Sequence, residues 1–474
     1  MTDLAGKTFD LLIVGAGPAG LAAATEAAGR GLSVGVFDEN PLVGGQIYRN
    51  VSGQSLIDRD ILGPDYFGGS RLVAEALSSG ATFYQGSTVW MIERPEGTSC
   101  FAVGVQREGI AEIVAAERIL IATGALERPF PIKGWTLPGV LTAGAAQTML
   151  KASGAVPSGR VVLAGSGPLL YLLAAQFLRA SAAPDAILDT TPRRNWLRAL
   201  PHLPEFMLSG YARKGISLLA EVRRSTQVIT NVTHLEAVGP GRLDHVLYVS
   251  GGESRRLEAD VLLLHQGVVP QVNLAMATEC EHTWNEERLA FEPRLNKGFH
   301  STVAGLYIAG DSVGISGAIA AEAAGRIVGL HVASDLGRLS AVELDRASKA
   351  PRSALKKALR GRRFIDALYR PGDRFRMPPD DVVVCRCEEV KAGDVRAAAI
   401  RGAQGPNQTK TFLRTGMGPC QGRLCGLTIT EILACQSQKR PSEIGYFHIR
   451  NPVKPITLGT LAALKSEGET TRLF

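Results

Sequence analysis

The sequence has few cysteines, and their distribution excludes a disulfide scaffold. Seven cysteines among 474 residues are too few for the dense pairing of small secreted domains. We therefore expect a reducing compartment that keeps most of them as thiols. Cys100, Cys280 and Cys435 stand apart from one another and are expected only to fill space. The other four gather near the C-terminal end, in "VVVCRCEEV" and "GMGPCQGRLCG".

The chain also lacks an uninterrupted apolar run long enough to cross a membrane. Its longest apolar stretch, "VVLAGSGPLLYLLAAQFL", contains a Gly-Ser-Gly-Pro segment typical of a turn between a buried strand and a helix. The first ten residues carry one Lys, and no secretory leader is visible. We expect a cytoplasmic protein without a transmembrane segment, at most attached peripherally to the inner membrane.

Common catalytic groupings are missing as well. The eight histidines are scattered, and none pairs with another at a metal-ligand spacing. His265 ends an apolar stretch and is expected to be a core residue. There is no Ser–His–Asp ordering and no phosphate-transfer loop, so the sequence predicts no catalytic residue in this chain.

The net charge of +7 is concentrated in one segment. Residues 346–376 hold eleven Lys or Arg against two Asp, so +7 less +9 leaves the rest of the chain at −2. No nucleic-acid motif accompanies these charges, and we expect no nucleic-acid partner. Two interpretations stay open. The segment is either a solvated linker helix between domains or a docking, phosphate-contacting face for a partner subunit.

A chain of this length predicts two or three domains. Residues 9–39 alternate strand, glycine turn, helix and strand, and the same pattern restarts at residue 159. The sequence therefore predicts an α/β fold with two Rossmann-like, dinucleotide-binding modules.

The first module carries the glycine pattern G-x-G-x-x-G directly after an apolar strand. The first glycine permits the tight turn, the second lets a pyrophosphate approach, and the third lets the helix pack closely. An acid at the end of the next strand accepts from a ribose hydroxyl, and Asp38 is preferred over its neighbour Glu39 for this contact. The predicted contacts of the turn itself are Gly15, Gly17, Pro18, Ala19 and Gly20.

The second module departs from this pattern. It keeps Gly165 and Gly167 but has Leu170 at the place of the third glycine, and Asp189 is available for a ribose. Either the helix has only moved away from its strand, or the site holds a different nucleotide. The second module could hold NAD, ATP or no ligand at all, and the sequence does not distinguish these alternatives.

Several further motifs resemble the flavoproteins with two dinucleotide domains, which include disulfide and ferredoxin reductases. The resemblance covers roughly residues 8–335 and implies FAD in the first module. Disulfide reduction is excluded, because residues 40–60 and 160–260 contain no cysteine. The additional FAD contacts that the resemblance implies are Gly44, Gly45, Gln46, Ala122, Thr123, Gly124, Gly310 and Asp311.

The four C-terminal cysteines have the spacing of a metal or cluster site. They are Cys385, Cys387, Cys420 and Cys425. Four thiolates can hold a [2Fe–2S] cluster or a structural zinc, although a C-x-C pair is less usual for zinc. The region resembles the bacterioferritin-associated-ferredoxin-like fold, which implies a small [2Fe–2S] domain with all four cysteines as ligands. An iron–sulfur centre beside a flavin converts two-electron into one-electron transfer.

The whole chain resembles the FAD- and [2Fe–2S]-containing α subunits of bacterial multi-subunit opine, amine and imino-acid dehydrogenases. "DENPLVGGQIYR", "LERPFPIKGWTLPGVLTAGAAQTMLK", "VVCRCEEV" and "FHIRNPVKPITLGTLA" carry this resemblance. It implies a β subunit of amino-acid-oxidase type that oxidises the C–H bond of the substrate, a small γ subunit and FMN at the subunit boundary. It also implies a quinone or the respiratory chain as acceptor. Two alternatives are a self-contained NAD(P)H-dependent FAD/[2Fe–2S] reductase and an iron–sulfur carrier that docks through the basic segment.

The expected organisation has six parts. They are an FAD-binding part (1–150), a second nucleotide module (151–258), a return part of the FAD domain (259–340), a basic linker (341–378), a [2Fe–2S] domain (379–440) and a C-terminal tail (441–474).

Overall fold

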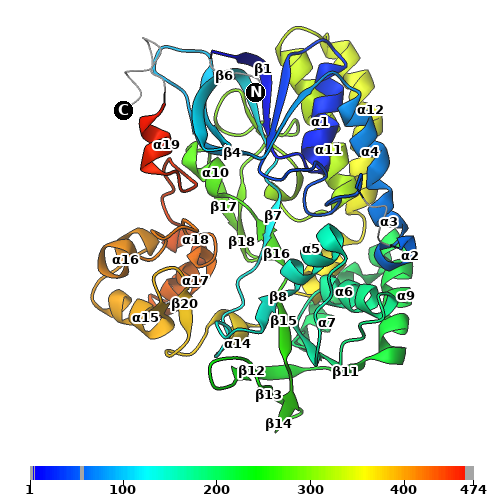
Figure 1. Cartoon of the computed structure of the whole chain (residues 1–474), viewed down its shortest axis with the longest axis vertical. Coiled ribbons are helices and arrows are strands. Elements are labelled where there is room, and N and C mark those ends of the chain that lie inside the picture. The colour runs from blue at the N-terminus through cyan, green and yellow to red at the C-terminus, as the bar shows by residue number, and fades with distance from the viewer. Residues whose placement is uncertain (1–3, 5, 54–57, 465–474) are drawn as a thin grey trace.

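Two sheets, one above the other in Figure 1, organise most of the chain, and a smaller helical domain lies beside them. The structure is a computed structural model that describes residue 4 and residues 6–53 and 58–464. The two sheets belong to the two modules that the glycine patterns predict, and the α/β fold with Rossmann-like sheets is confirmed.

The first sheet has the strand order β3-β2-β1-β6-β5-β4, with β19 beside β6. β1, β2, β3, β6 and β19 run parallel, while β4, β5 and β6 form an antiparallel meander. β1 and β2 are nearly continuous apolar runs, because both faces of a parallel sheet are covered. The strands are β1 (Thr8–Val14), β2 (Val34–Asp38), β3 (Thr82–Gln85), β4 (Ser87–Glu93), β5 (Phe101–Arg107), β6 (Ile110–Ile121) and β19 (Leu306–Ile308).

Two Ala-rich helices, α1 (Pro18–Ala28) and α11 (Ala318–Asp335), pack side by side against this sheet (Figure 1). Their small side chains are buried along most of both helices, which lets the backbones approach closely. α4 (Gly69–Leu77) packs on α1, and the short helices α2 (Arg59–Leu62) and α3 (Pro64–Phe67) precede it.

The second sheet is entirely parallel, in the order β11-β10-β9-β15-β8. Its outer strand β8 and its inner strand β15 both lie outside the expected span 151–258, yet they pair here. The strands are β8 (Val140–Thr142), β9 (Val161–Gly165), β10 (Ala186–Asp189), β11 (Gln227–Ile229) and β15 (Val261–His265). The helices and the antiparallel meander of this module are α5 (Ala143–Ser153), α6 (Pro168–Arg179), α7 (Arg194–Ala199), α8 (Leu203–Met207), α9 (Gly210–Ser225), β12 (Val232–Val238), β13 (His245–Ser250) and β14 (Glu253–Glu258).

The chain crosses between the modules twice, and the two crossings pair as strands. β7 (Ala125–Glu127) leads into the second module, and β16 (Val268–Pro270) leads out, antiparallel to β7. α10 (Asn273–Ala277) and the hairpin of β17 (His282–Asn285) and β18 (Ala290–Pro293) follow before β19 returns to the first sheet. These two paired strands therefore connect the two modules.

The basic segment forms helices that pack on the modules. α12 (Ala341–Leu359) begins with a Ser340–Glu343 capping box and lies against α11. α13 (Arg362–Leu368) lies against α7, and α14 (Asp373–Arg376) ends the segment. The segment thus connects the first sheet to the C-terminal domain along the surface of both modules.

The C-terminal domain carries the four cysteines and shares a core with the first sheet. Val384, Ile429 and Leu433 belong to the same buried cluster as Leu12 of β1. Beyond the domain, the backbone N–H of Val453 donates to the Trp90 carbonyl on β4 at 2.8 Å. The elements are β20 (Val383–Cys385), β21 (Val390–Lys391), α15 (Ala392–Ile400), α16 (Pro406–Leu413), α17 (Gly426–Gln436), α18 (Pro441–Ile444) and α19 (Leu458–Ala462).

Among the helices that the structure describes, none is both long enough and apolar enough to cross a membrane.

Candidate functional site

A cavity of about 860 Å³ lies where the carboxyl ends of the two sheets face each other. In open α/β sheets, ligands bind outside the carboxyl ends of the parallel strands. Most of the residues predicted to bind a cofactor line this one cavity. They are Gly15, Gly17, Pro18, Ala19, Asp38, Glu39, Gly45, Gln46, Ala122, Thr123, Gly124, Gly167, Gly310 and Asp311.

Gly20 and Gly44 lie behind the cavity wall and support it. A Cβ on Gly20 would stand 1.9 Å from the Gly15 carbonyl oxygen, so only glycine lets α1 begin this close to the strand. The Gly44 N–H donates to the Ala16 carbonyl at 2.8 Å and holds the neighbouring loop against the turn.

The first glycine turn presents free backbone to the cavity. Gly15 has φ +107°, and a Cβ there would lie 2.5 Å from the Ala122 carbonyl oxygen. α1 begins at Gly17 without any side-chain cap, so its first amides and the positive end of its dipole face the cavity. This arrangement suits a pyrophosphate.

The acid at the end of β2 is held rigidly at the cavity wall. The Asp38 carboxylate accepts from the Ala16 N–H at 2.6 Å and from the Asn40 N–H at 2.8 Å. Glu39 instead pairs with Lys454 of the C-terminal segment, with 2.6 Å between Nζ and Oε1. Lys454 also lines the cavity; it belongs to the tail motif "FHIRNPVKPITLGTLA", which carries the family resemblance but was not predicted to bind a cofactor.

The Gly-Asp element organises the start of α11. Asp311 Oδ1 accepts from the Ser316 and Gly317 N–H groups at 2.9 and 3.1 Å. Gly317 caps α11 without a side-chain hydrogen bond, and both Gly317 and Ala318 line the cavity. A second helix N-terminus therefore faces the same space.

The basic segment contributes residues that sequence reasoning did not place in the site. Arg362, Asp366 and Arg370 line the cavity. Asp366 pairs with Arg362 at 2.8 Å and with Arg288 at 3.1 Å. The sequence of this segment showed only a local excess of positive charge, which is typical of a solvated linker or of a docking, phosphate-contacting face.

This stretch is fixed from the second module. The buried side chain of Asn195 on α7 donates to the carbonyls of Leu368 and Arg370 at 2.9 and 2.8 Å. α13 is therefore a structural part of the cavity wall.

The second glycine turn is built differently from the first. Gly167 lines the cavity, but Gly165 and Asp189 do not. Asp189 Oδ2 accepts from the Tyr171 hydroxyl at 2.5 Å, and Oδ1 accepts from the Thr191 N–H at 2.8 Å. Leu170, at the place of the third glycine, is fully buried in the core. Asp38 is bonded by its own chain in the same way, so the difference between the two acids is that Asp38 lines the cavity and Asp189 does not.

The four predicted cysteines lie together, in two pairs. The Cys425 thiol hydrogen-bonds to Cys385, and that contact lowers the pKa of Cys385 to about 6. The same contact, together with burial, raises the pKa of Cys425. Cys387 pairs with Cys420, and burial raises the pKa of Cys387. All four sulfurs also interact with one another electrostatically.

Backbone groups surround these sulfurs. N–H groups of Gly416 and Glu388 help to lower the pKa of Cys385. A Cβ on Gly418 would stand 2.3 Å from the Cβ of Cys387, so the glycine-rich loop is packed directly against the thiols. Within the described part of the chain, no three His, Cys, Asp or Glu side chains are arranged to hold a metal ion.

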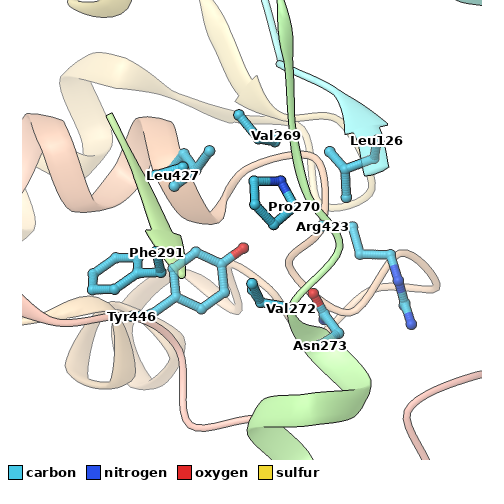
Figure 2. A pocket seen from close by; sticks show the side chains of 10 residues that line it. Leu126, Val269, Pro270, Val272, Asn273, Phe291, Arg423, Leu427 and Tyr446 are labelled. Carbon is cyan, nitrogen blue, oxygen red and sulfur yellow. The ribbon is translucent and has the colours of Figure 1, made fainter. Parts of the chain in front are cut away.

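A small cavity of about 10 Å³ separates the cysteine loop from the large cavity (Figure 2). Figure 2 shows Leu126 and Pro270 from β7 and β16 beside Arg423 and Leu427 from the cysteine loop and α17. Leu126, Pro270 and Ala290 line both cavities, so a single layer of side chains divides them.

Comparison with protein families gives two matches along the chain. Residues 9–327 match the pyridine nucleotide-disulphide oxidoreductase family, and residues 382–465 match the sarcosine oxidase A3 domain. The first match covers both modules, and the second covers the cysteine-bearing domain and most of the tail.

Individual relatives agree with these matches. The opine oxidase A subunit of Agrobacterium tumefaciens is 46% identical over 98% of this chain and 93% of its own length. Hydrogen cyanide synthase subunit HcnB of Pseudomonas aeruginosa is 29% identical over 96% of this chain and 99% of its own length. L-proline dehydrogenase from P. horikoshii shares the fold, with a TM-score of 0.71 and 20% identity over 97% of this chain and 81% of that one. The chain therefore belongs to the opine oxidase A-subunit family of oxidoreductases, within the pyridine nucleotide-disulphide oxidoreductases.

Proposed function

We propose that the chain is the electron-transfer subunit of a multi-subunit flavoprotein dehydrogenase. Its substrate is an opine, an imino acid or another secondary-amine derivative of an amino acid. Oxidation of the C–H bond takes place in a partner β subunit of amino-acid-oxidase type. The support for a partner is that the 46% identical relative is named as one subunit of an opine oxidase.

FAD fits the first module. The glycine turn and the amides of α1 bind its pyrophosphate, Asp38 orients the ribose, and the ordered loop at Asp311 faces the remainder of the cofactor. Bound FAD supplies exchange of electrons singly or in pairs. This chain's own residues bind and orient the cofactor and shield it from water.

A [2Fe–2S] cluster fits the four cysteines. Each iron of such a cluster takes two protein ligands, and the thiols are paired as Cys385 with Cys425 and Cys387 with Cys420. Surrounding backbone N–H groups stabilise thiolates and the charge on a cluster. Mononuclear zinc fits less well, because the C-x-C spacing of Cys385 and Cys387 is unusual for it.

The observation that carries this proposal is the shared wall. Leu126 and Pro270 line the FAD cavity on one side and the small cavity on the other, and the small cavity is also lined by Arg423 and Leu427, which flank Cys425 in the sequence. This closeness of the two sites supports electron transfer within the chain. The resemblance adds FMN at the subunit boundary, a small γ subunit and a quinone or respiratory-chain acceptor.

An NAD(P)H-dependent reductase is opposed by the second module. A nicotinamide cofactor needs a ribose contact there, and Asp189, unlike Asp38 of the first module, does not line the cavity. We therefore expect no direct reduction by NADH or NADPH.

The test mixes the isolated chain anaerobically with NADH and, separately, with NADPH while the flavin absorbance is followed. We expect no bleaching with either. Bleaching is expected only with the co-purified partner and an opine or imino acid. Rapid bleaching by a nicotinamide cofactor alone would refute the subunit proposal.

A further inference from the structure

Five large apolar side chains are exposed along α7 and α8 and at the turns that end these helices. Each of the five residues is between 55% and 76% exposed. None of them lines either of the two cavities described above. A group of exposed apolar side chains this close together marks a surface that binds a protein or a membrane. The five residues, which we call the α7–α8 patch, are Trp196, Leu197, Leu200, Met207 and Leu208.

The core does not need these side chains, because the inner face of the same helices is already packed. Ala199 forms a buried cluster with Phe364 and Leu368 of α13. The ring of Phe206 stacks on the ring of Phe364, with 4.2 Å between the centroids. The helices therefore carry apolar side chains on two faces, whereas the outer face of a surface helix is normally polar.

Basic residues surround the patch. Residues 193–214 contain five Arg or Lys and a single acid, Glu205. Residues 356–363, at the end of α12 and the start of α13, add five Arg or Lys and no acid. The two segments are in contact, because the Tyr211 hydroxyl donates to the Ala358 carbonyl at 3.1 Å.

Several of these positive charges are not neutralised by the chain itself. Arg194 and Lys214 pair with Asp373 and Asp65. Within the part of the chain that the structure describes, Arg198, Lys357 and Arg360 form no ion pair. The surroundings of the patch are therefore complementary to a negatively charged surface.

We propose that the α7–α8 patch docks the protein on an anionic lipid surface. The apolar side chains enter the boundary between headgroups and acyl chains, and the surrounding guanidinium and ammonium groups contact lipid phosphates. Trp196 suits this position, because an indole ring with its N–H favours the membrane–water interface. The inference goes beyond the proposed function and does not depend on it, since it rests on the patch and the charges around it.

A second copy of the chain and a protein partner suit the patch less well. A symmetric contact between two copies brings the same surface of each together, so the unpaired arginines and lysines repel one another. A protein partner needs a closely complementary surface of about 1,000 Å². Fluid lipid adapts instead to side chains that protrude from short helices and line no cavity.

The test mixes the purified full chain with vesicles of phosphatidylcholine and phosphatidylglycerol in equal parts and, separately, with vesicles of phosphatidylcholine alone. Co-sedimentation measures binding, and quenching of tryptophan fluorescence by lipids brominated in their acyl chains measures insertion. We expect binding with quenching on the anionic vesicles. Binding to the neutral vesicles should be at least about ten-fold weaker, because the phosphatidylcholine headgroup carries no net charge.

Two double variants separate the apolar from the electrostatic contribution. Leu197→Ser with Leu208→Ser removes the two most exposed side chains of the patch, and we expect the affinity for anionic vesicles to fall about ten-fold or more. Arg198→Gln with Arg360→Gln should lower the same affinity by about five-fold for each charge removed.

A matched control uses apolar residues of similar exposure elsewhere. Ile400 on α15 and Leu458 on α19 are 76% and 83% exposed, and both helices lie on the other side of Figure 1 from α7. Ile400→Ser with Leu458→Ser should bind anionic vesicles as tightly as the wild type. Because every substituted residue is exposed, we expect all three double variants to fold, with urea midpoints close to the wild type.

Absence of binding to the anionic vesicles, or equal binding by the Leu197/Leu208 variant and the wild type, overturns the inference. Loss of a dimer in that variant, measured by analytical ultracentrifugation, also overturns it and assigns the patch to a second copy of the chain. If the co-purified partner subunit blocks vesicle binding and the variant no longer retains that subunit, the patch belongs to the subunit interface instead. These outcomes leave the proposed function standing, because partner-dependent flavin reduction is measured separately.

Discussion

A buried ion pair between Arg376 and Glu431 holds the cysteine-bearing domain against the basic segment. Glu431 lies on α17, in the same helix that Cys425 begins, and only 3% of its side chain is exposed, against 11% for Arg376. Burial raises the pKa of Glu431, and the guanidinium groups of Arg376 and Arg128 oppose that rise. The carboxylate thus compensates two buried positive charges at the junction of three segments.

Replacing Glu431 by Gln keeps the shape of the side chain but removes the negative charge that balances Arg376 and Arg128. Breaking a buried ion pair lowers the free energy of unfolding by about 3–5 kcal/mol. Asp373 lies 2.7 Å from Arg376 and still balances part of its charge, so we expect a loss of about 3 kcal/mol, the lower end of that range. Glu443→Gln in the same domain is the matched control. Its ion pair with Arg440 is 3.1 Å long and exposed to solvent, so we expect no clear change in the free energy of unfolding.

Urea unfolding of the purified full chain, followed by tryptophan fluorescence, measures the difference. Trp135 reports on this junction, because its indole N–H donates to the Val383 carbonyl at 2.8 Å. We expect a clearly lower midpoint for Glu431→Gln and a midpoint close to the wild type for Glu443→Gln. Equal midpoints for the two variants would refute the reasoning.

Four further variants test the proposed redox sites and the stability of the chain. Asn273→Leu removes a 2.7 Å bond to the Gln421 carbonyl, and we expect slower cluster reduction in stopped-flow measurements at unchanged iron content. Cys425→Ser should lose the iron and its visible absorbance, whereas Cys435→Ser should retain both. Burial lowers the pKa of Lys151 to about 8 from 10.5, so between those pH values the unfolded chain binds more protons. Wild type should therefore gain up to about 3 kcal/mol of stability relative to Lys151→Met as the pH rises through that window, measured by urea unfolding.

The sequence predicts the first module well because its signals are local. A tight turn between a buried strand and a helix needs glycine at fixed spacing, and the acid that ends the next strand must lie beside that turn. Gly15, Gly17 and Asp38 accordingly line the cavity. The fold class follows from the same repeated pattern.

No comparable pattern in the sequence predicts that α13 forms part of the cavity wall. Arg362 and Arg370 lie in a segment whose backbone is held by Asn195, more than 160 residues earlier, and whose Phe364 and Leu368 pack in a buried cluster with Ala199. Charge content alone cannot distinguish this packing from a solvated linker. The pairing of β8 into the second sheet is hidden for the same reason, since it depends on contacts distant in sequence.

The place of Asp189 depends on packing that the sequence does not show. Leu170 marks a departure from the glycine pattern, but the sequence leaves open whether a nucleotide still binds. Once α6 is packed on its sheet, the Tyr171 hydroxyl donates to Asp189, and Asp189 does not line the cavity.

Three contacts fix the position of the cysteine loop relative to the two modules, which bears on the proposed electron transfer. Asn273 bonds the loop to the segment that follows β16, and Trp135 bonds β20 to the second module. Glu431 adds the ion pair to the basic segment. With three separate anchors, the distance between the two redox sites is set by packing. Variants of the anchors should therefore slow electron transfer while both cofactors stay bound, whereas Cys425→Ser removes a cofactor. The two classes of variant separate positioning from cofactor binding.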